Sequence, residues 1–332
     1  MTFEYPRTGL VLPEYAAVED DWLVDFAVRA ADAGFDSVWC GEGWGYNPFQ
    51  LLARVGERTD VCLGTCIANV FARSPTALAA NALALHDLTG GRFVLGLGTS
   101  TPQVVEAFHG GSFERPLRRL RETIEIVDLA LSGERIDYDG EVFSLRGFAL
   151  NHADGDEVPI FNAALGPTNV ALTIDFADGL LPHVMPLPAL ESVIARGEER
   201  AHSAANLHVS PSVPTSVSAD PAEAERVLAK HVAYYAGSTD FYNDVIASNG
   251  FRDEAEAIRS AWRGGDTEGA AAAVSRDLVD AVGIAGTPDD ARERVRELLD
   301  GTVDTALLSF PQGATDEMFE LALEALPEEE RP

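Results

Sequence analysis

The segment 164–169, ALGPTN, has the composition of a turn that binds a phosphate group. An apolar run ends just before Gly166, which permits close approach to the main chain, and Pro167 with Thr168 can begin a helix. The free N–H groups at a helix N-terminus attract an anion without any cationic side chain. We expect the N–H groups of Gly166, Thr168 and Asn169 to bind a phosphate here, although an ordinary strand-to-helix turn has the same composition.

A second glycine-rich segment, 95–102 (LGLGTSTP), matches two catalytic motifs only in part. It lacks the third glycine of the dinucleotide-binding pattern GxGxxG. It also has Pro102 where the nucleophile elbow GxSxG needs its final glycine. The segment alone therefore predicts neither a dinucleotide site nor a serine nucleophile.

Few titratable side chains follow the apolar runs of the sequence. Glu14 follows the first run, and Glu42 follows the second, close to Trp44 and Tyr46. A carboxyl group beside aromatic rings can have a raised pKa and exchange a proton, while capping of the next helix is the alternative role. His183 follows the sixth run and could line a pocket or be structural. The histidines have no metal-ligand spacing, so we expect no bound metal.

These residues follow short apolar runs that alternate with segments of helical periodicity. The runs predicted to be strands are 9–13, 36–40, 61–67, 92–98, 159–165, 179–182, 207–217 and 305–310. Helices predicted between them include 48–56, 74–88, 168–177, 187–205 and 287–299. An open doubly wound sheet usually has about six strands and its glycine-rich motif in the first unit. The pattern therefore predicts an α/β protein, a (β/α)8 TIM barrel whose site lies where the strands end.

Two stretches interrupt this alternation. Residues 134–156 are predicted to form a β-hairpin, and residues 234–282 are predicted to be mostly helical. We expect a single domain over residues 1–332 with insertions at these two places. Insertions between barrel units often cover the substrate.

The charge of the chain excludes several classes of partner. Asp and Glu number 54 against 24 Lys and Arg, a formal net charge of −30, and Lys230 is the single lysine. We expect no nucleic-acid and no membrane-surface partner, since both need clusters of basic residues. The composition resembles that of proteins from extreme halophiles such as halophilic archaea, with an ordinary acidic protein of a GC-rich genome as the alternative.

We predict that the fold depends on high salt. Carboxylate repulsion is screened over about 10 Å at 0.1 M salt but over about 3 Å at 1 M. The melting temperature should therefore rise between about 0.1 M and about 2 M KCl. An unchanged melting temperature would contradict this expectation.

The cysteines and the apolar runs indicate in which cellular compartment the protein lies. Cys40, Cys62 and Cys66 are odd in number and form no CxxC pair, which favours a reducing compartment. The N-terminal residues lack a signal-peptide pattern, and no apolar run reaches the roughly 18 residues of a membrane span. We expect a cytoplasmic protein that forms a homodimer or a higher homo-oligomer.

Eight ordered segments carry a resemblance to a known family. They are 35–44 (FDSVWCGEGW), 63–75, 88–99 (LTGGRFVLGLGT), 113–126, 138–150, 159–167 (PIFNAALGP), 177–182 and 264–288. In these segments the chain resembles the bacterial luciferase-like superfamily of flavin and deazaflavin oxidoreductases. Within it, the chain is similar to the coenzyme F420-dependent branch that includes methylenetetrahydromethanopterin reductase.

The resemblance implies a deazaflavin coenzyme at the C-terminal ends of the barrel strands. It implies a cis peptide between Cys66 and Ile67, which forms a bulge behind the coenzyme ring, and a coenzyme loop at 98–100. It also implies that the turn at 164–169 is the phosphate loop. The residues expected to bind the coenzyme are Cys66, Ile67, Asn69, Gly98, Thr99, Ser100, Ala164, Leu165, Gly166, Pro167 and Thr168.

The chain departs from the family pattern at two places. Several relatives have an acid–histidine pair where this chain has Glu42-Gly43, so histidine-assisted oxidation of an alcohol or a sugar is not expected. Other relatives have an acidic residue where this chain has Ser100-Thr101, which leaves the proton donor open.

The expected function is hydride transfer between coenzyme F420 and a small organic substrate, a methylenetetrahydromethanopterin or a methylenetetrahydrofolate. Glu42 or Glu14 is expected to have a polar or proton-handling role as the catalytic residue. One alternative is an FMN-dependent monooxygenase on the same fold. Another is a non-catalytic deazaflavin-binding protein.

Overall fold

The parallel strands of the protein form one curled sheet. The computed structural model describes residues 3–13, 15–43, 46–155, 157–204 and 206–325. Along the sheet the order is β10 (His208–Val209), β9 (Gly179–Leu180), β8 (Ile160–Asn162), β5 (Phe93–Gly98), β3 (Cys62–Thr65), β2 (Ser37–Cys40), β1 (Thr8–Val11), β13 (Ala306–Ser309), β11 (Ser212–Val217) and β12 (Ile284–Gly286). A short strand, β4 (Ala68–Asn69), pairs with β5. The predicted α/β class and parallel sheet are confirmed.

Each run that was predicted to be a strand contains at least one strand of this sheet. The strand β12 was not predicted, because it has three residues and lies between the helical insertion and the next helix. It pairs with the C-terminal half of β11.

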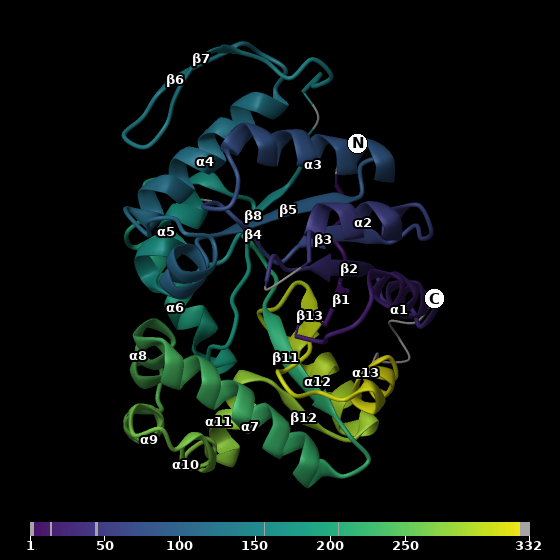
Figure 1. Ribbon diagram of the computed structural model, residues 1–332, viewed down its shortest axis with the longest axis vertical. Coiled ribbons are helices and arrows are strands. Elements are labelled where there is room, and N and C mark those ends of the chain that lie inside the picture. Colours follow the sequence, from purple (N-terminus) through teal and green to yellow (C-terminus); the bar gives the residue numbers. More distant parts are fainter. Residues whose placement is uncertain (1–2, 14, 44–45, 156, 205, 326–332) are drawn as a thin grey trace.

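Helices pack around the outside of the strands (Figure 1). They are α1 (Asp20–Asp32), α2 (Pro48–Gly56), α3 (Pro75–Thr89), α4 (Pro116–Leu131), α5 (Pro167–Phe176), α6 (Leu190–Glu198), α12 (Pro288–Leu299) and α13 (Asp316–Ala322). Proline in the first turn and a capping side chain mark several starts: Asn47 accepts the Gln50 N–H, and Ser74 accepts the Ala77 N–H. No helix in the described part of the chain is both long and apolar enough to cross a membrane.

The helix predicted at 187–205 is too long. In the structure α6 ends at Glu198, and the following residues turn back toward α5. The Asp175 carboxylate accepts the main-chain N–H groups of His202 and Ser203 at 2.7 and 2.8 Å. These bonds hold the chain in a turn, and they join residues too far apart for a local pattern to predict.

The second interruption is a helical insertion made of α7 (Pro221–Ser238), α8 (Asp240–Ser248), α9 (Arg252–Arg263), α10 (Thr267–Ala272) and α11 (Arg276–Val282). It begins at residue 221, earlier than the predicted 234, because α7 is one continuous helix. The insertion has its own apolar cluster, which includes Leu228, Ile246 and Ile258. Figure 1 shows it at the lower end of the molecule, where α7 lies beside β11 and β12.

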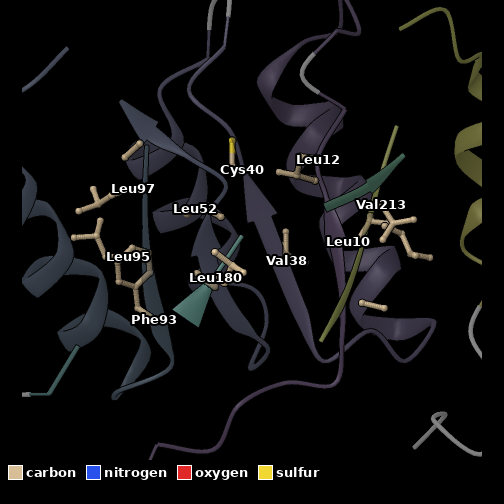
Figure 2. Close-up of a cluster of buried hydrophobic side chains, with 14 of the residues drawn as sticks. Leu10, Leu12, Val38, Cys40, Leu52, Phe93, Leu95, Leu97, Leu180 and Val213 are labelled. Atoms are coloured by element: carbon tan, nitrogen blue, oxygen red, sulfur yellow. The ribbon is translucent and has the colours of Figure 1, made fainter. Parts of the chain in front are cut away.

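Alternation along the strands divides the core into two layers. Val38 and Cys40 face the helices, while Trp39 between them faces the inside of the curled sheet. Figure 2 shows the outer layer, in which Leu10 and Val38 lie on neighbouring strands. On the inside, a Cβ atom on Gly64 would lie 2.3 Å from the Trp39 ring, so glycine is needed there to accommodate the indole.

The first interruption is a two-stranded hairpin, β6 (Ile136–Asp139) with β7 (Ser144–Phe148), paired antiparallel as predicted. The buried Glu122 of α4 holds its turn. Its carboxylate accepts the N–H groups of Glu141, Val142 and Phe143 at 2.8, 2.9 and 2.9 Å. Burial alone would raise the pKa of Glu122, but the three main-chain bonds together outweigh it and lower the pKa.

The substitution Glu122→Leu should destabilise the protein by about 1 to 3 kcal/mol, because three N–H groups lose their acceptor. A lowered pKa in the folded state contributes stability above the pKa of the unfolded state, and that stability is lost as the pH falls through the folded value. The difference between parent and variant in urea unfolding should therefore be largest near neutral pH and shrink in acid. Glu141→Gln, at an exposed carboxylate, is the control. An equal loss at acid and neutral pH would contradict this role.

Candidate active site

A cavity opens at the C-terminal ends of the parallel strands, on the side of the helical insertion. Eight of the residues predicted to be catalytic or to bind the coenzyme line it: Glu42, Cys66, Ile67, Gly98, Thr99, Ser100, Ala164 and Leu165. Asn69, Gly166, Pro167 and Thr168 do not line it, although Asn169 does. Glu14 lies outside the described residues. Strand ends that are far apart in the sequence therefore meet around one space.

The floor of the cavity is formed at the end of β3. The peptide bond between Cys66 and Ile67 is cis, as the resemblance implied. The Ile67 carbonyl accepts the N–H of Glu42 at 3.0 Å, and the N–H of Cys66 donates to the Cys40 carbonyl at 2.9 Å. Beyond the bulge, Asn69 pairs with Gly98 of β5. The segment 66–69 is thus fixed by main-chain bonds to the strands on both sides.

Glu42 is engaged through both carboxylate oxygens. Oε2 accepts the main-chain N–H of Asn69 at 2.8 Å, and Oε1 forms an ion pair with Arg73. The side chains of Glu42 and Arg73 are only 9% and 18% exposed, and the Arg73 guanidinium lies over the Phe49 ring. The geometry favours a polar, positioning role for Glu42. It does not cap the next helix, because Asn47 does.

The end of β5 carries a strained residue. Ser100 has φ of 56°, a left-handed conformation that residues with a side chain rarely adopt. Such outliers cluster at functional sites, where the surrounding structure holds them in place. Ser100 lines the cavity, and a π-helix, η1 (Gln103–Phe108), follows it.

The predicted phosphate turn lies at the start of α5, with Gly166 as the N-cap residue. A Cβ atom on Gly166 would meet no other atom within 4 Å, so the glycine faces open space. The Asn169 N–H donates to the Gly166 carbonyl at 3.0 Å and is therefore not available to a phosphate. In the described part of the chain the N–H groups of Gly166 and Thr168 have no such acceptor.

Aromatic side chains form the opposite wall. Tyr15 follows β1, Tyr234 and Tyr235 lie on α7, and Phe241 and Tyr242 lie on α8. The hydroxyl oxygens of Tyr15 and Tyr235 are 2.5 Å apart, within hydrogen-bond distance. The helical insertion thus contributes directly to the cavity.

His183 lies in the same wall as a neutral group. Its Nδ1 is 3.3 Å from the Ser212 carbonyl oxygen, so Nδ1 carries the hydrogen. Burial lowers the pKa of His183 to about 4. Behind it, His231 Nδ1 accepts the Gln312 N–H at 2.9 Å, and burial, followed by the nearby His183, lowers its pKa well below the usual value. Neither imidazole carries a charge near neutral pH.

The charge around the cavity is low for so acidic a protein. Among the lining residues that the structure describes, Glu42 is the single carboxylate, and none is lysine or arginine. The site therefore offers main-chain donors, hydroxyl groups, neutral imidazole and aromatic rings. This set can bind a planar cofactor and orient a substrate, but it cannot bind an anion through side-chain cations.

The chain is similar in sequence to a known protein family and to several of its members. Residues 15–305 match the luciferase-like monooxygenase family. The chain belongs to this family. A Mycobacterium tuberculosis protein whose name assigns it to the coenzyme F420-dependent oxidoreductases is 33% identical over 315 residues, covering 87% of this chain and 90% of that protein. The 5,10-methylenetetrahydromethanopterin reductase of Archaeoglobus fulgidus is 30% identical over 296 residues, covering 86% and 88%.

Two solved structures share the fold. The coenzyme F420-dependent tetrahydromethanopterin reductase of Methanopyrus kandleri aligns with a TM-score of 0.78 and 21% identity, over 97% of this chain and 99% of that one. A type II Baeyer–Villiger monooxygenase of Pseudomonas putida, in complex with FMN, aligns with a TM-score of 0.66 and 19% identity, over 98% of each chain. At these identities the likeness shows the fold alone.

In this luciferase-like protein, the residues at the strand ends were predicted from the sequence, but the aromatic residues of the opposite wall were not. Tyr235 and Tyr242 lie in a segment that was predicted only as a helical insertion. Tyrosines at helical spacing can line a cavity or pack in a core, and the local sequence does not distinguish the two positions. A prior expectation that insertions cover the substrate was the one available clue.

Proposed function

We propose that the protein is a coenzyme F420-dependent oxidoreductase that transfers a hydride to the methylene carbon of 5,10-methylenetetrahydromethanopterin or 5,10-methylenetetrahydrofolate. The proposal rests on family membership and on the relatives that share it. The single observation that carries it is the open space at Gly166, at a helix N-terminus beside the cavity. A coenzyme with a phosphate and a flat ring fits that arrangement.

The residues around the cavity fit such a coenzyme. The N–H groups of Gly166 and Thr168 would hold its phosphate, and the open space at Gly166 leaves room for it. A Cβ on Gly98 would lie 2.9 Å from the Ile67 side chain, so this glycine lets the two strand ends pack closely beneath a ring. The bulge at Cys66-Ile67 and the loop at 98–100 would contact that ring. When bound, the coenzyme supplies the hydride.

The residues of the chain would orient the reaction. Glu42 holds the segment 66–69 in place through Asn69 and the Ile67 carbonyl. The aromatic wall would exclude water and hold the substrate against the coenzyme, which favours hydride transfer over competing reactions. Glu14 remains the proposed second carboxylate.

Coenzyme titration in molar KCl tests the proposal. The fluorescence of coenzyme F420 should be quenched or shifted when the protein binds it. We expect a dissociation constant of about 1 to 100 μM for coenzyme F420 and weaker binding of FMN. Oxidation of the reduced coenzyme by 5,10-methylenetetrahydrofolate or its methanopterin analogue should then follow. Tighter binding of FMN would favour the monooxygenase alternative that the FMN-bound neighbour supports. Binding without turnover of either substrate would favour a non-catalytic binding protein.

We also infer that the sheet closes into a (β/α)8 barrel through residues 208–217. On one side, the N–H groups of Ser210 and Ser212 donate to the carbonyls of Leu180 and Pro182, both at 2.8 Å. On the other side, the Leu307 N–H donates to the Pro211 carbonyl at 3.1 Å. Main-chain bonds on both edges of this segment support closure.

A halophilic archaeal origin, a homodimer or higher homo-oligomer, and a cytoplasmic location are further proposals. The charge of −30 with a single lysine supports the first. Sedimentation in about 2 M KCl would test the oligomeric state, at a salt concentration where carboxylate repulsion is largely screened.

A further inference from the structure

We propose that His183 determines substrate specificity by accepting a hydrogen bond at Nε2 from an N–H group of the substrate's pterin ring. The inference rests on the proposed function and adds a specificity-determining residue to it. The His183 side chain lines the cavity and contacts the Tyr235 ring of the aromatic wall, with ring centroids 5.1 Å apart.

The backbone next to His183 is held in a strained conformation. Val184 has φ of 46°, a left-handed conformation that is rare for a β-branched residue. Its side chain is 1% exposed and belongs to the apolar cluster of the helical insertion. Such a conformation is retained only where the surrounding structure holds it, and it occurs often at functional sites. The insertion therefore fixes the chain at the residue that follows His183.

The imidazole of His183 is itself fixed from two sides. Its Nδ1 donates to the Ser212 carbonyl at 3.3 Å, and His183 and Ser212 also form a parallel β-bridge. The rings of Tyr235 and Tyr242 lie edge-on to the imidazole, with centroids 5.1 and 6.4 Å away. Because the side chain is already ordered, little conformational freedom is lost when a ligand binds to it.

The second ring nitrogen, Nε2, is an acceptor. Since Nδ1 carries the hydrogen, the neutral imidazole has a lone pair at Nε2. Within the described residues Nε2 makes no hydrogen bond, and it is not enclosed by protein atoms as the Nε2 of His231 is. Burial outweighs the bond to Ser212 and lowers the pKa of His183 to about 4. Near neutral pH, Nε2 therefore accepts a hydrogen bond and does not donate one.

The other polar side chains of the cavity are less selective. Both carboxylate oxygens of Glu42 already accept hydrogen bonds. The oxygen and the nitrogen of the Asn169 amide are bonded to neighbouring residues. The hydroxyl groups and the Gln103 amide contain both donors and acceptors, so they do not distinguish between ligand groups. Among the described lining residues, His183 thus presents the one unpartnered nitrogen or oxygen acceptor that carries no hydrogen.

A reduced pterin matches this requirement. The edge of its ring carries N–H groups and an amino group, all of which are donors. The aromatic wall can pack against the ring while Nε2 of His183 accepts a hydrogen bond from its edge. A site built to bond an N–H group rejects analogues that lack it, because the acceptor would then be left unpaired.

The test compares His183→Asn with the parent in about 2 M KCl, using reduced coenzyme F420 and 5,10-methylenetetrahydrofolate or its methanopterin analogue. Asparagine keeps an N–H where Nδ1 donates to Ser212, but it has no acceptor at the position of Nε2. We expect KM to rise by about 3- to 10-fold with kcat nearly unchanged, because bound substrate and transition state lose the same bond. The dissociation constant of coenzyme F420 should not change.

Two further variants complete the test. His183→Gln should restore most of the affinity, because its amide oxygen can reach the position of Nε2. His152→Asn, at an exposed histidine outside the cavity, is the control. Calorimetric titration of each variant with the substrate and oxidised coenzyme F420, which permits no turnover, should give the same order of affinities.

The outcomes separate this inference from the proposed function. An unchanged KM in His183→Asn would overturn the inference and leave the proposed function intact. A loss of kcat at unchanged KM, or an equal weakening of coenzyme binding, would also overturn it, since His183 would then act in the chemistry or in the fold. Absence of turnover by the parent with either substrate would overturn the proposed function and this inference with it.

Discussion

Replacing Gly166 with valine should weaken the binding of coenzyme F420 by about 10-fold or more, equivalent to about 1.4 kcal/mol. Gly166 has φ of −107°, an extended conformation that valine adopts readily, and its Cβ would meet no atom within 4 Å. The variant should therefore fold like the parent. Its side chain would occupy the space in which we propose that the phosphate approaches the N–H groups of Gly166 and Thr168.

Fluorescence titration in about 2 M KCl measures this effect under conditions in which surface charges are screened. Gly301→Val is the control, because a Cβ there would make only contacts of 3.5 Å or more and the residue does not line the cavity. Main-chain hydrogen bonds should also keep the affinity of the parent nearly constant as KCl rises. Unchanged affinity in Gly166→Val would place the phosphate elsewhere and leave the turn with a purely structural role.

The parts of this site that could be predicted from the sequence are those fixed by local pattern. Strands β2 and β5 follow from short apolar runs, and their ends place Glu42 and Gly98 at one edge of the sheet. The start of α5 follows from Gly166-Pro167, because proline is favoured in the first turn of a helix. Each of these features depends on residues within a few positions of one another.

The parts that could not be predicted depend on distant residues. Tyr15 and Tyr235 are 220 positions apart, and only the folded chain brings their hydroxyls together. The partner of Glu42 could not be predicted for the same reason, because Arg73 is 31 positions away. The aromatic residues next to Glu42 in the sequence suggested an acid that exchanges a proton rather than an ion pair. The left-handed conformation of Ser100 could not be predicted from its residue type, because glycine is the residue that usually adopts this conformation.

The substitution Glu42→Gln should both destabilise the protein and weaken coenzyme binding. The carboxylate is 9% exposed and neutralises Arg73, which is 18% exposed. Removing one partner of a largely buried pair leaves the other charge uncompensated and costs about 3 kcal/mol. The loss should also loosen Asn69 and the bulge at Cys66-Ile67, on which we expect the coenzyme ring to rest.

A double-mutant cycle with Arg73→Met separates positioning from proton donation. If Glu42 acts through the ion pair, each single variant should lose stability in urea unfolding, and the double variant should lose less than the sum. The coenzyme dissociation constant should rise in Glu42→Gln and in Arg73→Met alike, because both release the segment 66–69. If Glu42 instead acts as a general acid, we expect the opposite pattern. Stability and coenzyme affinity would then stay near those of the parent, and kcat would be lost in Glu42→Gln alone. That result would restore Glu42 as the catalytic acid.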